Sequence, residues 1–172
     1  MAIHEINKLH IAKFWDDEFK NLNYVRESFN DPESVTRWAT QGYSGPYTGT
    51  MCDMRQVQPS WNQRFVDFFA ARGYLDIGTS YYRMDTGTVL PVHGDLYKRY
   101  VDLFDLKGNE HWIYRSIVFL EDWQSGHYIE IDGTAITDWR AGDCIEWRYD
   151  APHMAANIGL LPRYTLQITG HK

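Results

Sequence analysis

Cysteine is scarce in this sequence, and its scarcity limits the classes of protein that fit. Only two cysteines occur among 172 residues, Cys52 and Cys144, and they match no C-x-x-C pattern. Their separation argues against a structural disulfide, which is a feature of secreted proteins. A reducing compartment suits this composition, so we expect a cytoplasmic protein.

Long apolar runs are missing as well. No stretch approaches the roughly 18 consecutive apolar residues that a membrane-spanning helix needs. The N-terminal stretch MAIHEINKLHIAKFWDDEF has neither a basic segment nor an unbroken apolar run. It therefore does not resemble a signal peptide. We expect a soluble protein with no membrane partner.

Basic residues are outnumbered by acidic ones. The chain has 17 Lys and Arg against 23 Asp and Glu, a formal net charge of −6. Proteins that bind polymeric nucleic acid rely on clustered Lys and Arg to contact phosphates. The charge balance argues against that class, although it leaves a single nucleotide open as a substrate.

Apolar and aromatic residues are present in the proportions of a folded domain. Hydrophobic residues make up 44% of the chain and aromatic residues 16%, which favours a globular fold over disorder. A chain of 172 residues can bury a substantial core, and no internal repeat divides it. We expect one domain, 1–172, in which the many aromatics favour β-rich packing or a stacking site.

The first part of the chain, residues 1–75, has helical periodicity and is predicted to be mostly helical support. One helix is predicted over residues 15–29 and is expected to end at Asn30-Asp31-Pro32. Residues 33–57 indicate irregular structure or a loose hairpin. A second helix is predicted between Pro59 and Gly73. Its apolar residues recur at helical spacing and predict a core face, not a ligand site: Trp61, Phe65, Phe68 and Phe69.

From residue 74 onward the pattern changes to short strands. They are predicted at 78–85, 89–93, 112–120, 127–131, 143–148 and 163–169. Asp132-Gly133 is typical of a tight hairpin turn, and residues 97–106 predict a short helix inside a long connection. Helices followed by many antiparallel strands indicate a mainly β fold, a sandwich or barrel with helices packed outside.

The last predicted strand, RYTLQIT at 163–169, has two unlike faces. Its apolar alternate residues can pack against the helices, while Arg163, Thr165, Gln167 and Thr169 can line a cavity. If the preceding connection folds back symmetrically near Ile158, His153 lies directly opposite Arg163. Directly opposed residues of paired strands share a face, so we expect both side chains in the cavity.

His93-Gly94-Asp95 places an imidazole and a carboxylate two residues apart. On an extended strand such residues project from one face. They would supply two of the three groups of the 2-His-1-carboxylate facial triad, which holds non-haem Fe(II). With 7 His and 23 Asp and Glu in the chain, chance predicts about one such match, and one is present. The motif therefore carries weight only together with residues elsewhere.

Taken in order, His93, Asp95, His153 and Arg163 resemble the ligand set of the Fe(II)/2-oxoglutarate-dependent oxygenases. The resemblance covers residues 78–170 and implies their fold, a double-stranded β-helix (a jelly-roll, cupin-like core) packed by the N-terminal helices. Within that superfamily, the chain is most similar to the aspartyl/asparaginyl β-hydroxylase-like branch, which includes amino-acid hydroxylases. The similar segments are LPVHGD at 90–95, Arg115, WRAGD at 139–143, Pro152-His153 and Asn157. Where that branch often has a second His after the strand arginine, this chain has Ile117.

The resemblance implies an enzyme, a dioxygenase in which His93, Asp95 and His153 hold Fe(II). Three metal positions would then serve 2-oxoglutarate and O2, and the reaction would release succinate and CO2. Arg163 would bind the far carboxylate of 2-oxoglutarate, because a guanidinium fork matches a carboxylate better than an ammonium does. The residues expected to assist in binding the co-substrate or substrate are Thr165, Tyr82 and Arg115. Hydroxylation of an amino acid or a peptide side chain is the expected function.

Three other functions stay open at this point. The same chemistry could act on a nucleobase or another small metabolite. A cupin-type metalloenzyme would bind metal without 2-oxoglutarate and would leave Arg163 without a carboxylate to bind. A non-catalytic jelly-roll domain would use none of these residues. The loops expected to set substrate specificity are 40–58 and 96–111, and the second is a candidate lid.

Overall fold

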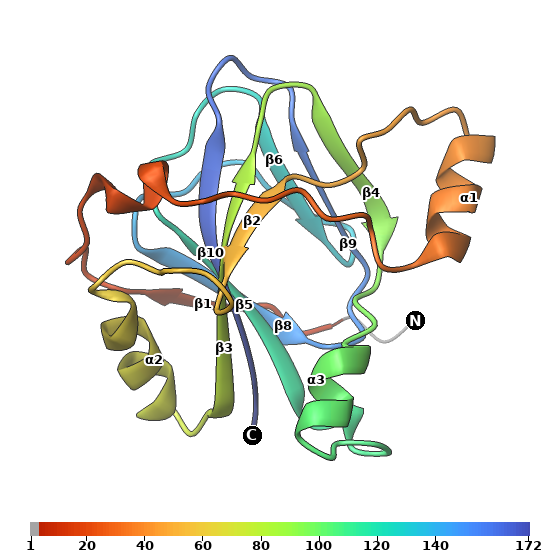
Figure 1. Ribbon diagram of the computed structural model, residues 1–172. Helices are drawn as coiled ribbons and strands as arrows, with labels where there is room; N and C mark the ends of the chain where they lie inside the picture. Colours follow the sequence, from red (N-terminus) through yellow and green to blue (C-terminus); the bar gives the residue numbers. More distant parts are fainter. Residues whose placement is uncertain (1–3) are drawn as a thin grey trace.

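Antiparallel strands dominate the computed structural model, which describes residues 4–172 (Figure 1). Residues 4–172 form a six-stranded and a four-stranded sheet that face each other. The larger sheet has the order β1 (Asn7–His10), β8 (Asp143–Arg148), β5 (Ile113–Phe119), β10 (Arg163–His171), β3 (Leu75–Met84) and β2 (Thr50–Asp53). The smaller sheet has the order β4 (Thr88–His93), β9 (His153–Asn157), β6 (His127–Ile131) and β7 (Thr134–Ile136). The predicted mainly β fold with a double-stranded β-helix core is confirmed.

Helical segments lie outside the two sheets. They are α1 (Pro32–Thr40), α2 (Asn62–Ala70), α3 (Lys98–Leu103) and two 3-10 helices, Asp17–Asn21 and Glu110–Trp112. The helix predicted between Pro59 and Gly73 is confirmed as α2, and the short helix predicted over 97–106 is confirmed as α3. In residues 4–172 no helix is long and apolar enough to cross a membrane.

The two faces of β10 separate apolar from polar side chains as predicted. Tyr164, Leu166 and Ile168 belong to the core between the larger sheet and α2, together with Phe65 and Phe69. The opposite face of β10 looks toward the smaller sheet. A second core, which includes the buried Trp139 and Trp147, fills much of the space between the sheets. One strand therefore joins the hydrophobic core to the interior of the β-helix.

The predicted Asp-Gly hairpin is confirmed between β6 and β7. Ile131 pairs with Thr134 across a two-residue loop. Asp132 and Gly133 both have positive φ, 47° and 78°, as a type I′ turn requires. This turn suits the right-handed twist of the flanking strands and ends the smaller sheet.

The helix predicted over residues 15–29 is wrong. Within that range only Asp17–Asn21 is helical, as a 3-10 turn, and Val25 instead forms an isolated bridge with Met51 of β2. Asn30-Asp31-Pro32 does not end a helix, as predicted, but begins α1. Asp31 caps the helix by accepting the Glu33 N–H, and Pro32 occupies a first-turn position where its missing N–H costs nothing.

Residues 33–57 are also more regular than predicted, since they contain most of α1 and all of β2. Residues 4–75 are therefore less helical than predicted and contain strands as well as helices. This part of the chain supplies both outer strands of the larger sheet, with β1 pairing to β8 and β2 pairing to β3. Neither strand shows a strong alternating pattern, which explains why the sequence did not indicate them.

The predicted pairing of His153 with Arg163 is wrong, although both residues line the same cavity. β9 pairs with β4 and β6 in the smaller sheet, while β10 pairs with β3 and β5 in the larger one. The two strands therefore face each other from opposite sheets. Parity along the chain predicts which face a residue occupies but not which sheet its strand joins.

A candidate metal centre beside a buried arginine

A cavity of about 200 Å³ lies between the two sheets and contains most of the predicted site residues. Both sheets contribute to its walls, and the segment 27–30 together with Thr48 borders it from outside the strands. Apolar side chains line one part of it, among them Leu90, Ile129 and Ile131. Polar side chains gather in two places, one around His93 and the other around Arg163.

His93 is the last residue of β4 and is buried. Its ring packs edge-on against Phe29 and Trp38, with ring centroids 5.0 Å and 6.0 Å away. The indole N–H of Trp38 on α1 donates to the Val92 carbonyl at 3.3 Å. The Nδ1–H of His93 donates to the Pro91 carbonyl at 2.8 Å, which leaves the Nε2 lone pair free for a metal. Sequence analysis did not single out Phe29 or Trp38, which hold this ring from the N-terminal segment.

His153 is the first residue of β9 and sits directly across from His93 in the pairing of β9 with β4. The two rings lie 4.3 Å apart between centroids. The Nδ1–H of His153 donates to the Ala151 carbonyl at 3.0 Å, so its Nε2 is free as well. Each histidine is therefore oriented by the carbonyl two residues before it, and the same nitrogen is exposed to the same point.

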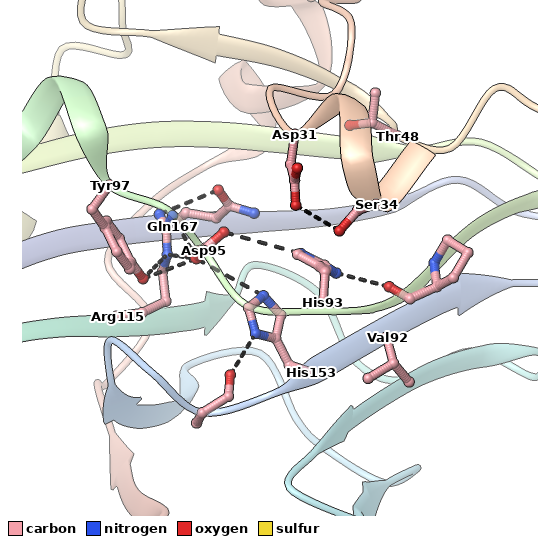
Figure 2. Close-up of polar contacts among 12 residues, drawn as sticks. Asp31, Ser34, Thr48, Val92, His93, Asp95, Tyr97, Arg115, His153 and Gln167 are labelled. Carbon is pink, nitrogen blue, oxygen red and sulfur yellow. Dashed lines mark hydrogen bonds and ion pairs between the residues drawn. The ribbon is translucent and has the colours of Figure 1, made fainter. Parts of the chain in front are cut away.

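Asp95 completes the group two residues after His93 (Figure 2). The Nε2 of His93 lies 4.0 Å from Oδ1 of Asp95, and the Nε2 of His153 lies 3.8 Å from Oδ2. One ligand atom from each residue falls within 4.8 Å of the others. Two imidazole nitrogens and one carboxylate oxygen are the donor set of the facial triad that binds Fe(II), so the chemistry of these residues fits that metal.

The surroundings favour the protonation states that bind metal. Burial lowers the pKa of His93 to about 4, and the neighbouring His153 adds to this effect. Burial alone would raise the pKa of Asp95, but the ion pair with Arg115, with smaller contributions from the histidines and the Tyr97 hydroxyl, outweighs it and holds that pKa well below its usual range. Near neutral pH the imidazole of His93 is therefore neutral and the carboxylate is ionised, as metal ligation requires.

Arg163 begins β10 and is buried at the other polar part of the cavity. Its Nη1 donates to the Tyr128 carbonyl at 2.7 Å, whereas its buried Nε–H has no hydrogen-bond partner among the described residues. Burial lowers the pKa of Arg163 to about 10, so the side chain stays protonated near neutral pH. A buried cation with an unused donor is costly unless a ligand supplies the missing charge.

Tyr82 and Thr165 accompany Arg163. They face each other on the paired strands β3 and β10, and both line the cavity. The Tyr82 hydroxyl accepts the Gly49 N–H and shares a hydrogen bond of 3.0 Å with the Thr48 hydroxyl. The structure therefore brings Arg163, Tyr82 and Thr165 together, as the predicted grouping requires. Whether they contact a co-substrate stays a prediction.

Arg115 lies with the metal ligands, not with Arg163. Its Nη2 and Nε donate to Oδ2 of Asp95 at 2.9 Å and 3.1 Å. Its Nε also reaches the Tyr97 hydroxyl at 3.2 Å, and its Nη1 lies 3.5 Å from Oε1 of Gln167. The prediction that Arg115 contacts 2-oxoglutarate or the substrate is untested. Tyr97, which sequence analysis did not single out, stands two residues after Asp95, and that proximity was the available signal.

The two loops expected to control specificity occupy different places. Thr48, from the 40–58 loop, borders the cavity directly. The 96–111 loop instead carries α3 and forms a small core of its own with β5, in which Tyr97, Val101, Leu106 and Ile113 are buried. The role of residues 96–111 as a lid stays a prediction. Residues 27–30, which were not predicted to do so, border the cavity.

Comparisons with known proteins place this fold among double-stranded β-helices. The sequence matches no protein-family model and no curated protein. The structure is similar to a prolyl-4-hydroxylase of Pseudomonas putida, with a TM-score of 0.56 and 14% identity over 98% of this chain and 94% of that chain. It is also similar to SnoN, the non-haem α-ketoglutarate-dependent epimerase of nogalamycin biosynthesis, with a TM-score of 0.54 and 13% identity over 96% of this chain and 77% of that chain. At these identities the similarity shows the fold.

Proposed function

We propose that this protein is an Fe(II)- and 2-oxoglutarate-dependent dioxygenase that hydroxylates an amino acid or a peptide side chain. One observation carries the proposal: a triad of metal-binding groups and a buried, unneutralised guanidinium share a cavity. The ligand atoms of His93, Asp95 and His153 lie within 4.8 Å of one another. Arg163 lines the same cavity with a donor left free.

The residues have separate roles in this proposal. His93, Asp95 and His153 would hold Fe(II), and Arg163 would bind the far carboxylate of 2-oxoglutarate, with Tyr82 and Thr165 beside it. Bound iron and co-substrate would supply the oxidising chemistry, with release of succinate and CO2. The apolar wall, which includes Ile129 and Ile131, would contact the co-substrate methylenes and exclude water.

The activities of two similar structures support the proposal, because one is a prolyl-4-hydroxylase and the other an α-ketoglutarate-dependent epimerase. The first also supports an amino-acid side chain as the target. A cupin-type enzyme that needs no 2-oxoglutarate leaves the buried charge of Arg163 unexplained. The dicarboxylate co-substrate accounts for both polar groups of the cavity.

Visible absorption of the anaerobic protein tests the proposal. Chelation of Fe(II) by the keto acid should give a weak charge-transfer band in the green region when Fe(II) and 2-oxoglutarate are added. The band should be lost in His93→Ala and kept in His111→Ala, which removes an exposed histidine outside the cavity. Amino acids and peptides would then be screened for a mass gain of one oxygen atom with matching succinate release.

Two results would contradict the proposal in different ways. Iron binding without the band would favour the cupin-type enzyme, because the metal site would then function without a chelating keto acid. Absence of iron binding would remove the catalytic interpretation altogether.

A further inference from the structure

The two oxygens of the Asp95 carboxylate have unequal surroundings. Oδ2 accepts three hydrogen bonds, from Nη2 of Arg115 at 2.9 Å, from Nε of Arg115 at 3.1 Å and from the Tyr97 hydroxyl at 2.8 Å (Figure 2). Within residues 4–172 no donor bonds to Oδ1. Both oxygens face the histidines, since Oδ1 lies 4.0 Å from Nε2 of His93 and Oδ2 lies 3.8 Å from Nε2 of His153. Only Oδ1, however, is free of hydrogen bonds to the protein.

Tyr97 adopts an uncommon backbone conformation at this point. Its φ is 47°, in the left-handed region that bulky residues rarely enter. The residue is nevertheless buried, its ring packs in the small core with Val101 and Ile113, and its hydroxyl joins Asp95 to Arg115. Strained residues of this kind persist where the surrounding structure holds them, and they concentrate at functional sites. In this conformation the Tyr97 hydroxyl reaches the Asp95 carboxylate.

We propose that Arg115 and Tyr97 are positioning residues that keep Asp95 a one-oxygen metal ligand, with Oδ1 toward the metal. The inference rests on the proposed function. A carboxylate that chelates through both oxygens takes two coordination positions, so with two histidines it leaves two of six. A carboxylate that binds through one oxygen leaves three, the number that a chelating keto acid and O2 require together. Three donors on Oδ2 compete with the metal for that oxygen.

Metal affinity tests the proposal without relying on turnover. Mn(II) binding to the metal-free protein would be followed by electron paramagnetic resonance for wild type, Arg115→Gln, Arg115→Lys and Tyr97→Phe. Loss of a hydrogen-bond partner that orients a metal ligand typically weakens metal binding 10- to 100-fold. We expect that loss for Arg115→Gln, because the lost orientation of Asp95 costs more affinity than a second carboxylate oxygen adds. Tyr97→Phe removes one of three donors and should lose a few-fold, while Arg115→Lys should recover part of the affinity.

A control removes a more exposed arginine–aspartate ion pair elsewhere. Arg83 donates through Nε to Oδ1 of Asp85 at 2.7 Å, outside the cavity lining. Arg83→Gln should therefore leave Mn(II) affinity at the wild-type value. If Arg115 were only structural, Arg115→Gln would lower the melting temperature of the metal-free protein but leave metal affinity unchanged.

The charge-transfer band gives a second, spectroscopic measurement. In Arg115→Gln saturated with Fe(II), Asp95 is free to chelate through both oxygens and to compete with the keto acid. The 2-oxoglutarate concentration needed for half-maximal absorbance should rise at least tenfold, although Arg163 is intact. Tyr97→Phe should shift it in the same direction by less.

The outcomes separate this inference from the proposed function. If wild type binds neither Mn(II) nor Fe(II), the proposed function fails and the positioning role fails with it. If wild type binds metal and both Arg115→Gln and Tyr97→Phe bind it within twofold of wild type, the positioning role is wrong and the proposed function stands. Should Arg115→Gln fail to fold, Tyr97→Phe decides, because it keeps the ring and the core around it.

Discussion

Two arginines line the same cavity in opposite electrostatic states, Arg163 fully buried and Arg115 partly buried. Arg115 on β5 and Arg163 on β10 come from neighbouring strands of the larger sheet. Burial lowers the pKa of Arg163 to about 10, and among residues 4–172 no carboxylate opposes that effect. Burial acts on Arg115 too, but Tyr97 and Asp95 outweigh it and raise the pKa of Arg115.

The difference shows how one residue type can serve two purposes. A buried guanidinium that the protein neutralises stabilises the arrangement of its partner, which here is Asp95. A buried guanidinium without a carboxylate partner in the protein has a desolvation cost, which a bound anion can offset. We therefore assign Arg115 to the support of the metal ligands and Arg163 to the binding of a carboxylate. The predictions below test that contrast, in order of decreasing effect.

Asp95→Ala should have the largest effect, because it leaves the partly buried Arg115 without its carboxylate. Removing one partner of a fully buried ion pair costs about 3 kcal/mol or more, and this pair is partly exposed to solvent. We expect the free energy of unfolding in urea to fall by up to about 3 kcal/mol and Mn(II) binding to be lost. An unchanged unfolding free energy would show that water replaces the carboxylate and that Arg115 is not desolvated.

Arg163→Met should not destabilise the protein, in contrast to Asp95→Ala, but it should remove 2-oxoglutarate binding. The substitution replaces a buried charge by an apolar side chain that matches the arginine chain as far as Nε, so the free energy of unfolding should stay the same or rise by about 1 kcal/mol. Affinity for 2-oxoglutarate should fall at least 100-fold. In wild type with Mn(II), 2-oxoglutarate at 100 times its dissociation constant should add about 2.7 kcal/mol of stability.

The melting temperature with and without 2-oxoglutarate checks both parts of the Arg163→Met prediction. The variant should melt at or above the wild-type temperature when ligand-free and should show no ligand-induced shift. A variant that is clearly destabilised, yet still shifted by 2-oxoglutarate, would move the carboxylate site away from Arg163.

Thr165→Val should have the smallest effect. Thr165 lies on the cavity face of β10, as Arg163 does, and its side chain keeps its shape when the hydroxyl becomes a methyl group. If the hydroxyl bonds to the co-substrate as proposed, losing that hydrogen bond costs about 1 kcal/mol, so the KM for 2-oxoglutarate should rise roughly fivefold with kcat unchanged. Thr169→Val, on the same face but outside the cavity lining, is the control and should leave KM unchanged.

Much of this arrangement follows from local sequence patterns. The alternation along 163–169 correctly separates the polar face from the core face of β10. Arg163, Thr165 and Gln167 line the cavity as predicted, whereas Thr169 lies outside it. The spacing of His93 and Asp95 correctly predicts that they converge, and His153 joins them as expected. Each of these predictions needs only the two-residue period of a strand together with an ordered set of polar residues.

The remainder depends on contacts between distant parts of the chain. Arg115 and Asp95 meet because the loop with α3 brings the start of β5 back to the end of β4. The placement of β9 and β10 in opposite sheets is decided by which strands they join, and no local pattern records that choice. The error over residues 15–29 arose differently, because Asp31-Pro32 is a common signal for both the start and the end of a helix.

The position of β10 has a consequence for the order in which the molecule is built during synthesis. Residues 163–171 follow every other strand along the chain, yet β10 lies inside the larger sheet, between β5 and β3. A ribosome must therefore release nearly all of the described chain before the two halves of that sheet can join. Because β10 also carries Arg163, the nascent chain would gain its central strand and its carboxylate-binding group in the same late event.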